Sequence, residues 1–287
     1  MTGTSPSSDS GASLGSNRHI ALLIDADNVS HSKIAAILSE LTKYGTPNIR
    51  RAYGDWTSNQ LAGWRGKLHE FAIRPIQQFS YSTGKNATDI SLVIEAMELL
   101  YTQRLDGFAI ASSDADFTPL VMHLKAAGHD VYGFGERKTP EPFVNACSTF
   151  LYLDTLGTAA IEDASAVKPA PTAAKPAATR RAAASSDAAT GTGPPIKPPR
   201  PLAQDAKLVT LLRGAVEAAA RDDGWALLST AGSAAKRLAP IDPRNYGVKN
   251  FPALFEATDL FEIVRDKGGR AYIADRRNKD RAAKPAG

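Results

Sequence analysis

The chain has 287 residues, of which 43% are hydrophobic and 22% are charged, and its formal net charge is +4. This length and composition suit a soluble protein of two ordinary domains, or of one domain with a module and a linker. The single cysteine, Cys147, excludes an internal disulfide framework and a cysteine zinc site, and we expect it to be a small core residue.

The first part of the chain predicts alternating strands and helices. Residues 1–17 are rich in Ser, Gly and Thr, and we expect a disordered tail there. In the segment 18–155, strands are predicted at 19–25, 48–55, 72–80, 107–116 and 129–135. Helices are predicted at 30–45, 58–71, 88–103, 117–128 and 140–147. The alternation predicts an α/β domain with a mostly parallel sheet flanked by helices.

The second half is organised differently. Residues 156–204 are rich in Ala and Pro, which predicts a semi-extended linker. Residues 205–276 have the pattern of three helices followed by two strands around the turn sequence DKGG, which predicts a winged helix-turn-helix module. We expect residues 277–287 to form a frayed basic tail.

The charge follows the same division. Residues 1–158 carry 13 basic and 16 acidic side chains, residues 159–204 carry six and three, and residues 205–287 carry 15 and 11. The first part is mildly acidic and the rest is basic. This offset suits a protein that binds a polyanion and holds a cation to act on it, although many proteins without such a function carry similar offsets.

Carboxylates recur at equivalent places in the predicted sheet. Asp25 and Asp27 lie where the first strand ends, and Asp114 and Asp116 lie where the fourth ends. Asp89 opens the helix that leads into the fourth strand. Ligands of open parallel sheets bind beyond the carboxyl ends of the strands, so we expect these acids at one edge if the first and fourth strands are neighbours.

Carboxylates held close together stay ionised only if a cation lies between them. Oxygen ligands without His or Cys suit Mg²⁺ or Mn²⁺ rather than zinc, and such ions support phosphodiester hydrolysis. Each acid taken alone is more simply a helix N-cap, but separate caps have no reason to gather at one edge. Asp55, which also ends a strand, is interpreted as a loop or cap residue.

Three segments of the first domain resemble the motifs of the NYN family, LabA-like branch, in the PIN-like nuclease superfamily. They are LLIDADN (22–28), GKNATDISLVIEAMEL (84–99) and IASSDADF (110–117). The resemblance implies catalytic, metal-binding carboxylates at Asp25, Asp89, Asp114 and Asp116. It also implies substrate-binding residues at Asn28, Lys85, Ser112 and Ser113.

The resemblance implies the activity as well as the site. It implies a metal-dependent endoribonuclease that uses Mg²⁺ or Mn²⁺ to cleave single-stranded RNA and leaves a 5′-phosphate. Asp27 is an additional carboxylate beside Asp25, and it either supports the site or is solvated.

Residues 205–276 resemble the OST-HTH, or LOTUS, domain. Gly224-Trp225, the helix after Ser229, Tyr246-Gly247 and the closing wing carry this resemblance. It implies RNA binding, or in some members docking of a protein partner. The basic side chains available for phosphate contacts are Lys236, Arg237, Lys249, Arg265, Lys267 and Arg270. Each of them taken alone is slightly better explained as a solvated surface residue.

The aromatic residues of this module divide into two groups. We expect core positions for Trp225, Phe251, Phe255 and Phe261. Tyr246 is the aromatic residue that we place most readily at the surface.

Two other functions stay open. A catalytically weak NYN/LOTUS protein would act as an RNA-binding or regulatory adaptor. A phosphatase of the haloacid dehalogenase type would use Asp25 and Asp27, but Asn28 stands where that family usually has Thr or Val. No signal peptide and no membrane span are expected, so we expect a cytoplasmic protein without membrane partners. The sequence does not define the oligomeric state.

Overall fold

The computed structural model describes residues 18–79, 87–156, 202–266 and 268–285. The expected N-terminal tail, nearly all of the expected linker, and both Lys85 and Lys267 lie outside these residues. Within the part of the chain that is described, no helix is both long and apolar enough to cross a membrane.

The N-terminal domain contains a six-stranded sheet. Its strands are β1 (His19–Asp25), β2 (Thr46–Gly54), β3 (Arg74–Gln77), β4 (Gly107–Ala111), β5 (Asp130–Gly135) and β6 (Thr149–Tyr152). Their order is β3-β2-β1-β4-β5-β6, and every neighbouring pair is parallel. Residues of β1 such as Ile20 to Ile24 are fully buried because helices cover both faces of the sheet.

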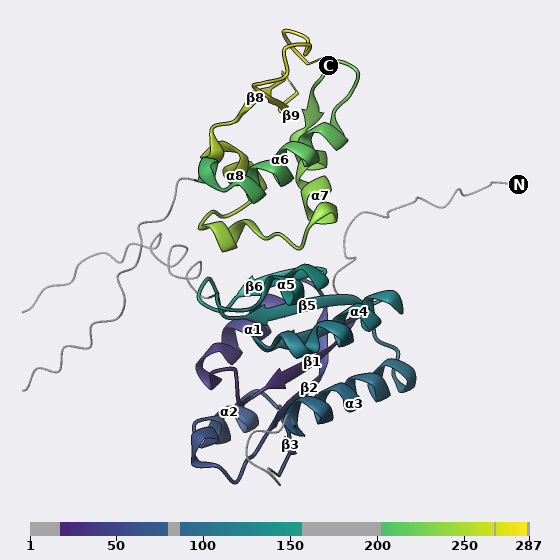
Figure 1. Cartoon of the computed structure of the whole chain (residues 1–287), viewed down its shortest axis with the longest axis vertical. Helices are drawn as coiled ribbons and strands as arrows, with labels where there is room; N and C mark the ends of the chain where they lie inside the picture. The colour runs from purple at the N-terminus through teal and green to yellow at the C-terminus, as the bar shows by residue number, and fades with distance from the viewer. Residues whose placement is uncertain (1–17, 80–86, 157–201, 267, 286–287) are drawn as a thin grey trace, which may run out of the picture.

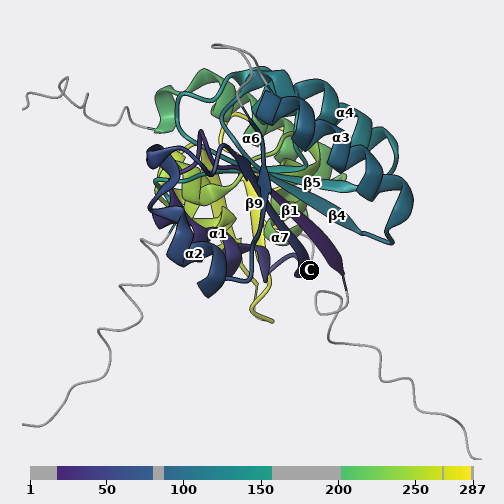
Figure 2. The same cartoon turned by 90° about the horizontal axis from the view of Figure 1, so that it is seen from below.

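The helices divide between the two faces. They are α1 (Ile34–Leu41), α2 (Trp64–Glu70), α3 (Ala87–Thr102), α4 (Thr118–Ala126) and α5 (Glu141–Ala146), with short 3-10 turns η1 (His31–Lys33), η2 (Asn59–Leu61) and η3 (Ala115–Phe117). Figure 2 shows α1 and α2 on one side of the strands and α3 and α4 on the other. Alternate residues of β1 serve the two cores: Leu22 packs with the α1 side and Leu23 with the α3 side. The expected α/β fold, mostly parallel and flanked by helices, is confirmed.

The sequence analysis missed β6. This strand has only four residues and follows α5 with just two residues between them, so it shows no alternation long enough to detect. Its pairing partner, Tyr132 to Gly135 of β5, is distant in sequence. Cys147, which precedes β6, is buried as expected, and burial raises the pKa of its thiol to about 12.

The C-terminal domain is the expected winged helix-turn-helix. It contains α6 (Ala206–Ala219), α7 (Leu228–Leu238) and α8 (Phe251–Thr258), the strands β7 (Ala226–Leu227), β8 (Phe261–Arg265) and β9 (Ala271–Asp275), and the 3-10 turns η6 (Leu202–Gln204) and η7 (Pro243–Tyr246). The sheet order is β7-β9-β8, all antiparallel. Trp225, Phe255 and Phe261 are buried as predicted.

The expectation of a frayed tail after residue 276 is wrong for the residues described. The indole Nε1 of Trp225 donates to the carbonyl of Ala282 over 2.9 Å, and the Ala282 amide donates to the Asp223 carbonyl over 2.9 Å. Arg281 forms an ion pair with Glu262. The segment packs here because a buried indole N–H needs an acceptor, and the Ala282 carbonyl supplies one. The basic composition of the segment gives no sign of this contact.

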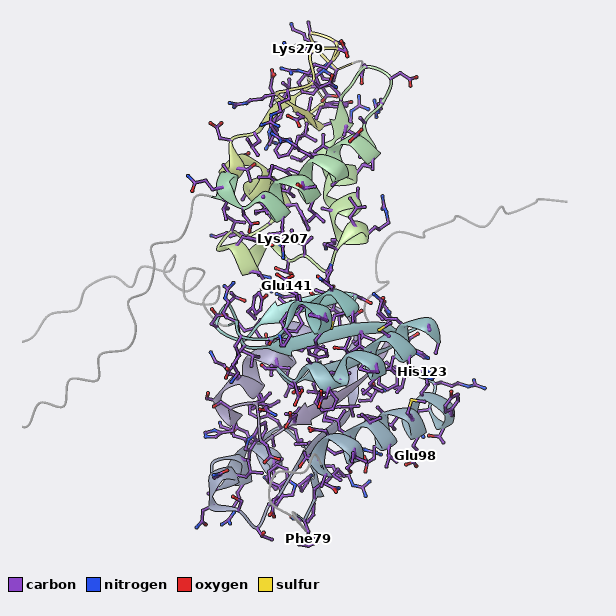
Figure 3. The ribbon with its side chains drawn as sticks, in the orientation of Figure 1. Phe79, Glu98, His123, Glu141, Lys207 and Lys279 are labelled. Atoms are coloured by element: carbon purple, nitrogen blue, oxygen red, sulfur yellow. The ribbon has the colours of Figure 1, made fainter. Side chains whose placement is uncertain are left out.

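The two domains contact each other along the β6 edge of the sheet (Figure 1). The side-chain amide of Asn245 accepts a bond from the Tyr152 amide over 3.2 Å and donates to the Phe150 carbonyl over 2.8 Å. It therefore pairs with the edge strand as a backbone peptide group would. Lys207 and Glu141 face each other across the same junction (Figure 3), with 2.5 Å between Nζ and Oε1.

A buried ion pair completes the junction. Arg244 of the C-terminal domain lies 2.5 and 2.7 Å from the carboxylate oxygens of Glu40 on α1, whose side chain is 5% exposed. Arg244 also bonds Asp242 over 2.8 Å. Burial would raise the pKa of Glu40, but the hydrogen bonds from Arg244 and Lys43 outweigh it and lower that pKa. Glu40 is thus an acid supplied with its own cation.

Candidate acidic metal centre

The topology brings the first and fourth strands together. β1 and β4 are parallel neighbours, with Ile24 opposite Ala111, so Asp25 and Ser112 reach the same edge of the sheet. The strand order reverses direction at this pair, because β2 follows on one side and β5 on the other. This is the switch point where open parallel sheets bind ligands.

Asp25 is fully buried, and only one of its two carboxylate oxygens has hydrogen-bond partners. Its Oδ2 accepts from the Asn28 side-chain amide over 2.7 Å and from the Ser112 hydroxyl over 2.8 Å. Its Oδ1 is buried without a hydrogen-bond partner. Burial raises the pKa of Asp25, the two hydrogen bonds oppose this, and the charge of Asp27 adds to it.

The pKa of Asp89 is shifted by the other acids, which shows that they lie near it. It lies in the first turn of α3, and its pKa is raised to about 6. Burial contributes most, followed by the charges of Asp25, Asp114, Asp116 and Asp27 in that order. The acids from two strand ends and one helix start therefore share one electrostatic environment, as the sequence pattern predicted.

Asp27 has a definite place in this arrangement. Its Oδ2 accepts a hydrogen bond from the Thr88 hydroxyl over 3.0 Å. The bond joins the loop after β1 to the start of α3, next to Asp89. Asp27 is itself exposed, so both interpretations left open for it stay predictions.

Asp114 is also a cap. Its Oδ1 accepts from the Asp116 amide over 2.8 Å, which caps η3, and its own amide donates to the Ser112 hydroxyl over 3.1 Å. The capping interpretation and the acidic-centre interpretation therefore both hold for this residue. The Ser113 hydroxyl accepts from the Glu136 amide over 2.8 Å. Both serines thus contact the protein itself, and their expected contact with substrate stays a prediction.

The donor set fits a hard divalent cation. In the part of the chain that is described, the charged groups that act on Asp89 are carboxylates, and the unpartnered Oδ1 of Asp25 is a buried acceptor whose desolvation a cation would compensate. Among the described residues, however, no three His, Cys, Asp or Glu side chains already stand in a metal-holding arrangement.

The sequence analysis missed a polar network behind the centre. The Tyr53 hydroxyl donates to Glu95 over 2.9 Å, and Arg51 lies 2.5 Å from the same carboxylate. Tyr53 stands opposite Asp25 in the β1–β2 register, and Glu95 belongs to α3. The network therefore fixes the helix that carries Asp89 against the sheet. An acid at position 95, in the middle of α3, was the available signal.

The basic residues of the C-terminal domain are grouped only in part. Lys236, Arg265 and Arg270 line one groove, with Phe251 in its wall. Phe251 is therefore only partly the core residue that we expected, whereas Tyr246 is half-buried, with a pKa raised to about 12 by burial, rather than exposed. Two further predicted residues, Arg237 and Lys249, are exposed and are not among the residues that line this groove.

Comparisons with known proteins agree with both domains. The NYN domain family matches residues 19–154, and the OST-HTH/LOTUS domain family matches residues 200–273. An uncharacterized protein of Methanocaldococcus jannaschii is 32% identical over 123 residues, covering 40% of this chain and 47% of that protein. The chain thus spans about half the length of this curated relative.

One solved structure is also similar. A protein of unknown function from Vibrio parahaemolyticus aligns with a TM-score of 0.40 at 17% identity, covering 47% of this chain and 92% of that one. The family matches do not support the haloacid dehalogenase alternative. The N-terminal domain therefore matches the NYN domain family, and the domain that follows it matches the OST-HTH/LOTUS domain family.

Proposed function

We propose that this protein is a Mg²⁺- or Mn²⁺-dependent endoribonuclease that hydrolyses single-stranded RNA, with a C-terminal domain that binds the RNA. The observation that carries the proposal is the environment of Asp89, whose pKa is raised first by burial and then by the charges of four other acids near it. The unpartnered Oδ1 of Asp25 at the same edge supports it. The charged groups that act on Asp89 are all carboxylates, and like charges held together are unfavourable for folding alone, so they favour a function.

The residues of the centre have separate tasks in this proposal. Asn28 and Ser112 hold Oδ2 of Asp25, which fixes the direction in which Oδ1 points. The Thr88–Asp27 bond holds the start of α3, and with it Asp89, beside β1. Asp25, Asp89, Asp114 and Asp116 would hold the cation, which supplies Lewis acidity for phosphodiester hydrolysis when bound.

The charge of the centre explains why the cation is needed. The five carboxylates create a negative potential that repels an RNA phosphate. The phosphodiester approaches this edge only after that charge is neutralised. Lys85, which the resemblance places near the scissile phosphate, lies outside the described residues.

A second function is favoured by one observation. No three acidic, His or Cys side chains of the described residues are already arranged around a metal position. A protein that retained the fold but held a cation weakly would act as an RNA-binding adaptor. The two functions differ in turnover, and the same assay separates them.

The test is cleavage of a labelled single-stranded RNA with Mn²⁺, Mg²⁺ or EDTA. We expect metal-dependent cleavage by the wild type and a loss of at least about 100-fold for Asp25→Asn/Asp114→Asn. Asp55→Asn is the matched control, because Asp55 follows β2 at the same sheet edge but bonds Thr57 and Gln77. Cleavage in EDTA, or by the double variant, contradicts the proposal. A folded protein that cuts no RNA with any metal supports the adaptor.

A further inference from the structure

Lys236, near the end of α7, lines two separate grooves. The first, the wing groove, has a volume of about 720 Å³ and lies between α7, α8 and the wing. The second, the junction groove, has a volume of about 440 Å³ and is lined by residues of both domains. One lysine therefore joins a cavity of the C-terminal domain to a cavity that exists only where the domains meet.

The wing groove carries cations and an apolar wall. Arg265 and Arg270 join Lys236 there, and no acidic residue lines it, although Arg270 is paired with Asp266. The Lys236 ammonium lies 5.7 Å from the ring centroid of Phe251. Cations beside an aromatic face suit a phosphate and a base of a single strand, because every base has a face that stacks.

The junction groove is also basic. Lys125 of α4 faces it from the N-terminal domain, and Lys236 and Arg237 face it from α7. Asp130 is the one acidic residue in its lining, and Arg18 pairs with that carboxylate at 2.5 Å. The hydroxyl and amide groups that complete the lining come from Tyr44, Tyr132, Asn145, Ser148 and Thr149. The groove offers three cations to an anionic ligand.

The docking of the domains creates this surface. Arg244 to Glu40 and Asn245 to the β6 edge hold α7 near α4 and β5. Both contacts use groups that are largely buried, so the junction differs from a chance contact between exposed charges. The junction groove is absent if the domains separate.

We propose that the two grooves form one continuous track for the backbone of a single-stranded RNA, running from the wing over the end of α7 to Lys125. The track needs both domains, so it is a property of the whole chain and not of the winged-helix domain alone. A polynucleotide is its ligand because cations line two grooves that share Lys236 and one groove wall is aromatic. A compact anion would use only one of the grooves.

The position of the track implies a class of substrate. Asp130 begins β5, whereas the acidic centre lies beyond the carboxyl ends of the parallel strands β1 and β4. The six residues of β5 separate these edges by about 20 Å, at roughly 3.3 Å per residue. An RNA held in the junction groove reaches the acidic centre only if it extends over that distance. This requirement for long single strands rests on the proposed nuclease function, whereas the binding track does not.

Binding is measured by fluorescence anisotropy of a labelled 20-nucleotide RNA with the full chain in EDTA, where no cleavage interferes. Lys236→Glu, Lys125→Glu and Arg265→Glu are each expected to raise Kd about fivefold to tenfold and to flatten its salt dependence. Lys279→Glu is the matched control, because this exposed lysine lies at the far tip of the molecule (Figure 3). Its Kd is expected to stay within twofold of the wild type.

The affinities of Lys125→Glu and Lys236→Glu decide whether RNA binding uses both grooves. Wild-type affinity of Lys125→Glu would overturn the shared track and restrict binding to the wing groove. Wild-type affinity of Lys236→Glu would overturn it entirely. Charge-neutral Lys236→Gln and Lys125→Gln, checked by circular dichroism, separate loss of binding from misfolding. Equal competition by an acidic 20-residue peptide would contradict a polynucleotide track and indicate a protein partner.

A cleavage assay distinguishes failure of the binding track from failure of the proposed nuclease function. With Mn²⁺ present, Lys125→Glu is expected to slow cleavage of a 20-nucleotide RNA at subsaturating concentration and to leave cleavage of a dinucleotide unchanged. If the wild type cuts neither RNA but the binding differences remain, the nuclease proposal fails and the track stands. If cleavage is intact but Lys125→Glu behaves as the wild type in binding, the track fails alone.

Discussion

Asp25 and Glu40 are both buried carboxylates of the N-terminal domain, yet their surroundings are opposite. Glu40 receives Arg244 and Lys43, and its pKa is lowered. Asp25 receives two neutral donors, keeps one oxygen without a partner, and has a raised pKa. The comparison teaches that a buried acid with its own cation holds domains together, whereas buried acids without one are assembled for a ligand.

Removing the cation from Glu40 should have the largest effect on stability. Arg244→Ala leaves Glu40 and Asp242 without their guanidinium, and we expect a loss of about 2–4 kcal/mol, since the Arg244 side chain is 21% exposed. Differential scanning calorimetry should then resolve separate transitions for the two domains. Arg276→Ala is the control, because its pair with Asp259 is exposed and should be worth at most about 1 kcal/mol. An unchanged melting curve for Arg244→Ala would remove the distinction between the two acids.

Lowering the pH should weaken the contact between the two domains, as the removal of Arg244 does. The pKa values of Glu40 and Asp242 are lowered below their ordinary 4.5 and 3.8, so their ionised forms stabilise the docked state at neutral pH. That contribution is complete above the ordinary values and disappears as the pH falls through the lowered ones. Small-angle scattering at pH 7 and about pH 3 should show the domains separating in acid. For Glu40→Gln/Asp242→Asn, any separation should depend less on pH.

The next largest effect should come from removing a hydrogen-bond donor to Asp25, which should weaken Mn²⁺ binding. Asn28→Ala removes one of the two donors to its Oδ2, and we expect Mn²⁺ affinity to fall about tenfold or more. Asn59→Ala, at an exposed asparagine of η2, is the control. Equal affinities for both variants, measured by calorimetric titration, would show that the orientation of Asp25 is unimportant.

The smallest expected effect is a gain in stability when the repulsion between the acids of the centre is reduced. Asp89→Asn removes one charge from a group of five acids, and we expect the metal-free protein to gain roughly 1 kcal/mol, or about 2–4 °C in Tm. Mn²⁺ should raise the Tm of the wild type more than that of the variant. Asp222→Asn, at an exposed acid of the C-terminal domain, should change neither value. A lower Tm for Asp89→Asn in EDTA would mean that Asp89 stabilises the fold.

The placement of acids at one sheet edge could be predicted because its sequence pattern is local, whereas their role as a metal centre stays a prediction. A buried strand followed by acid appears twice, and the parallel neighbours β1 and β4 bring Asp25 and Asp114 to one edge. The winged helix followed equally from helix spacing and a hairpin turn. Element ends were less accurate, and the predicted helix 30–45, for example, is α1 with the short turn η1 before it.

The sequence was insufficient where the contacts are distant. Glu40 and Arg244 are 204 positions apart, and nothing in either segment predicts their pairing. Asn245 has the sequence context of an ordinary turn residue, but its amide closes the β6 edge. The packing of Ala282 and Arg281 against Trp225 uses an indole N–H bond and a cation–π contact, which composition does not reveal.

Titration of Mn²⁺ into the metal-free protein, followed by isothermal calorimetry, tests the central distinction most directly. We expect saturable binding to the wild type, its loss in Asp25→Asn/Asp89→Asn, and full retention in Glu40→Gln. Binding that survives in the acidic-centre variant, or none in the folded wild type, would contradict a cation site at the ends of β1 and β4.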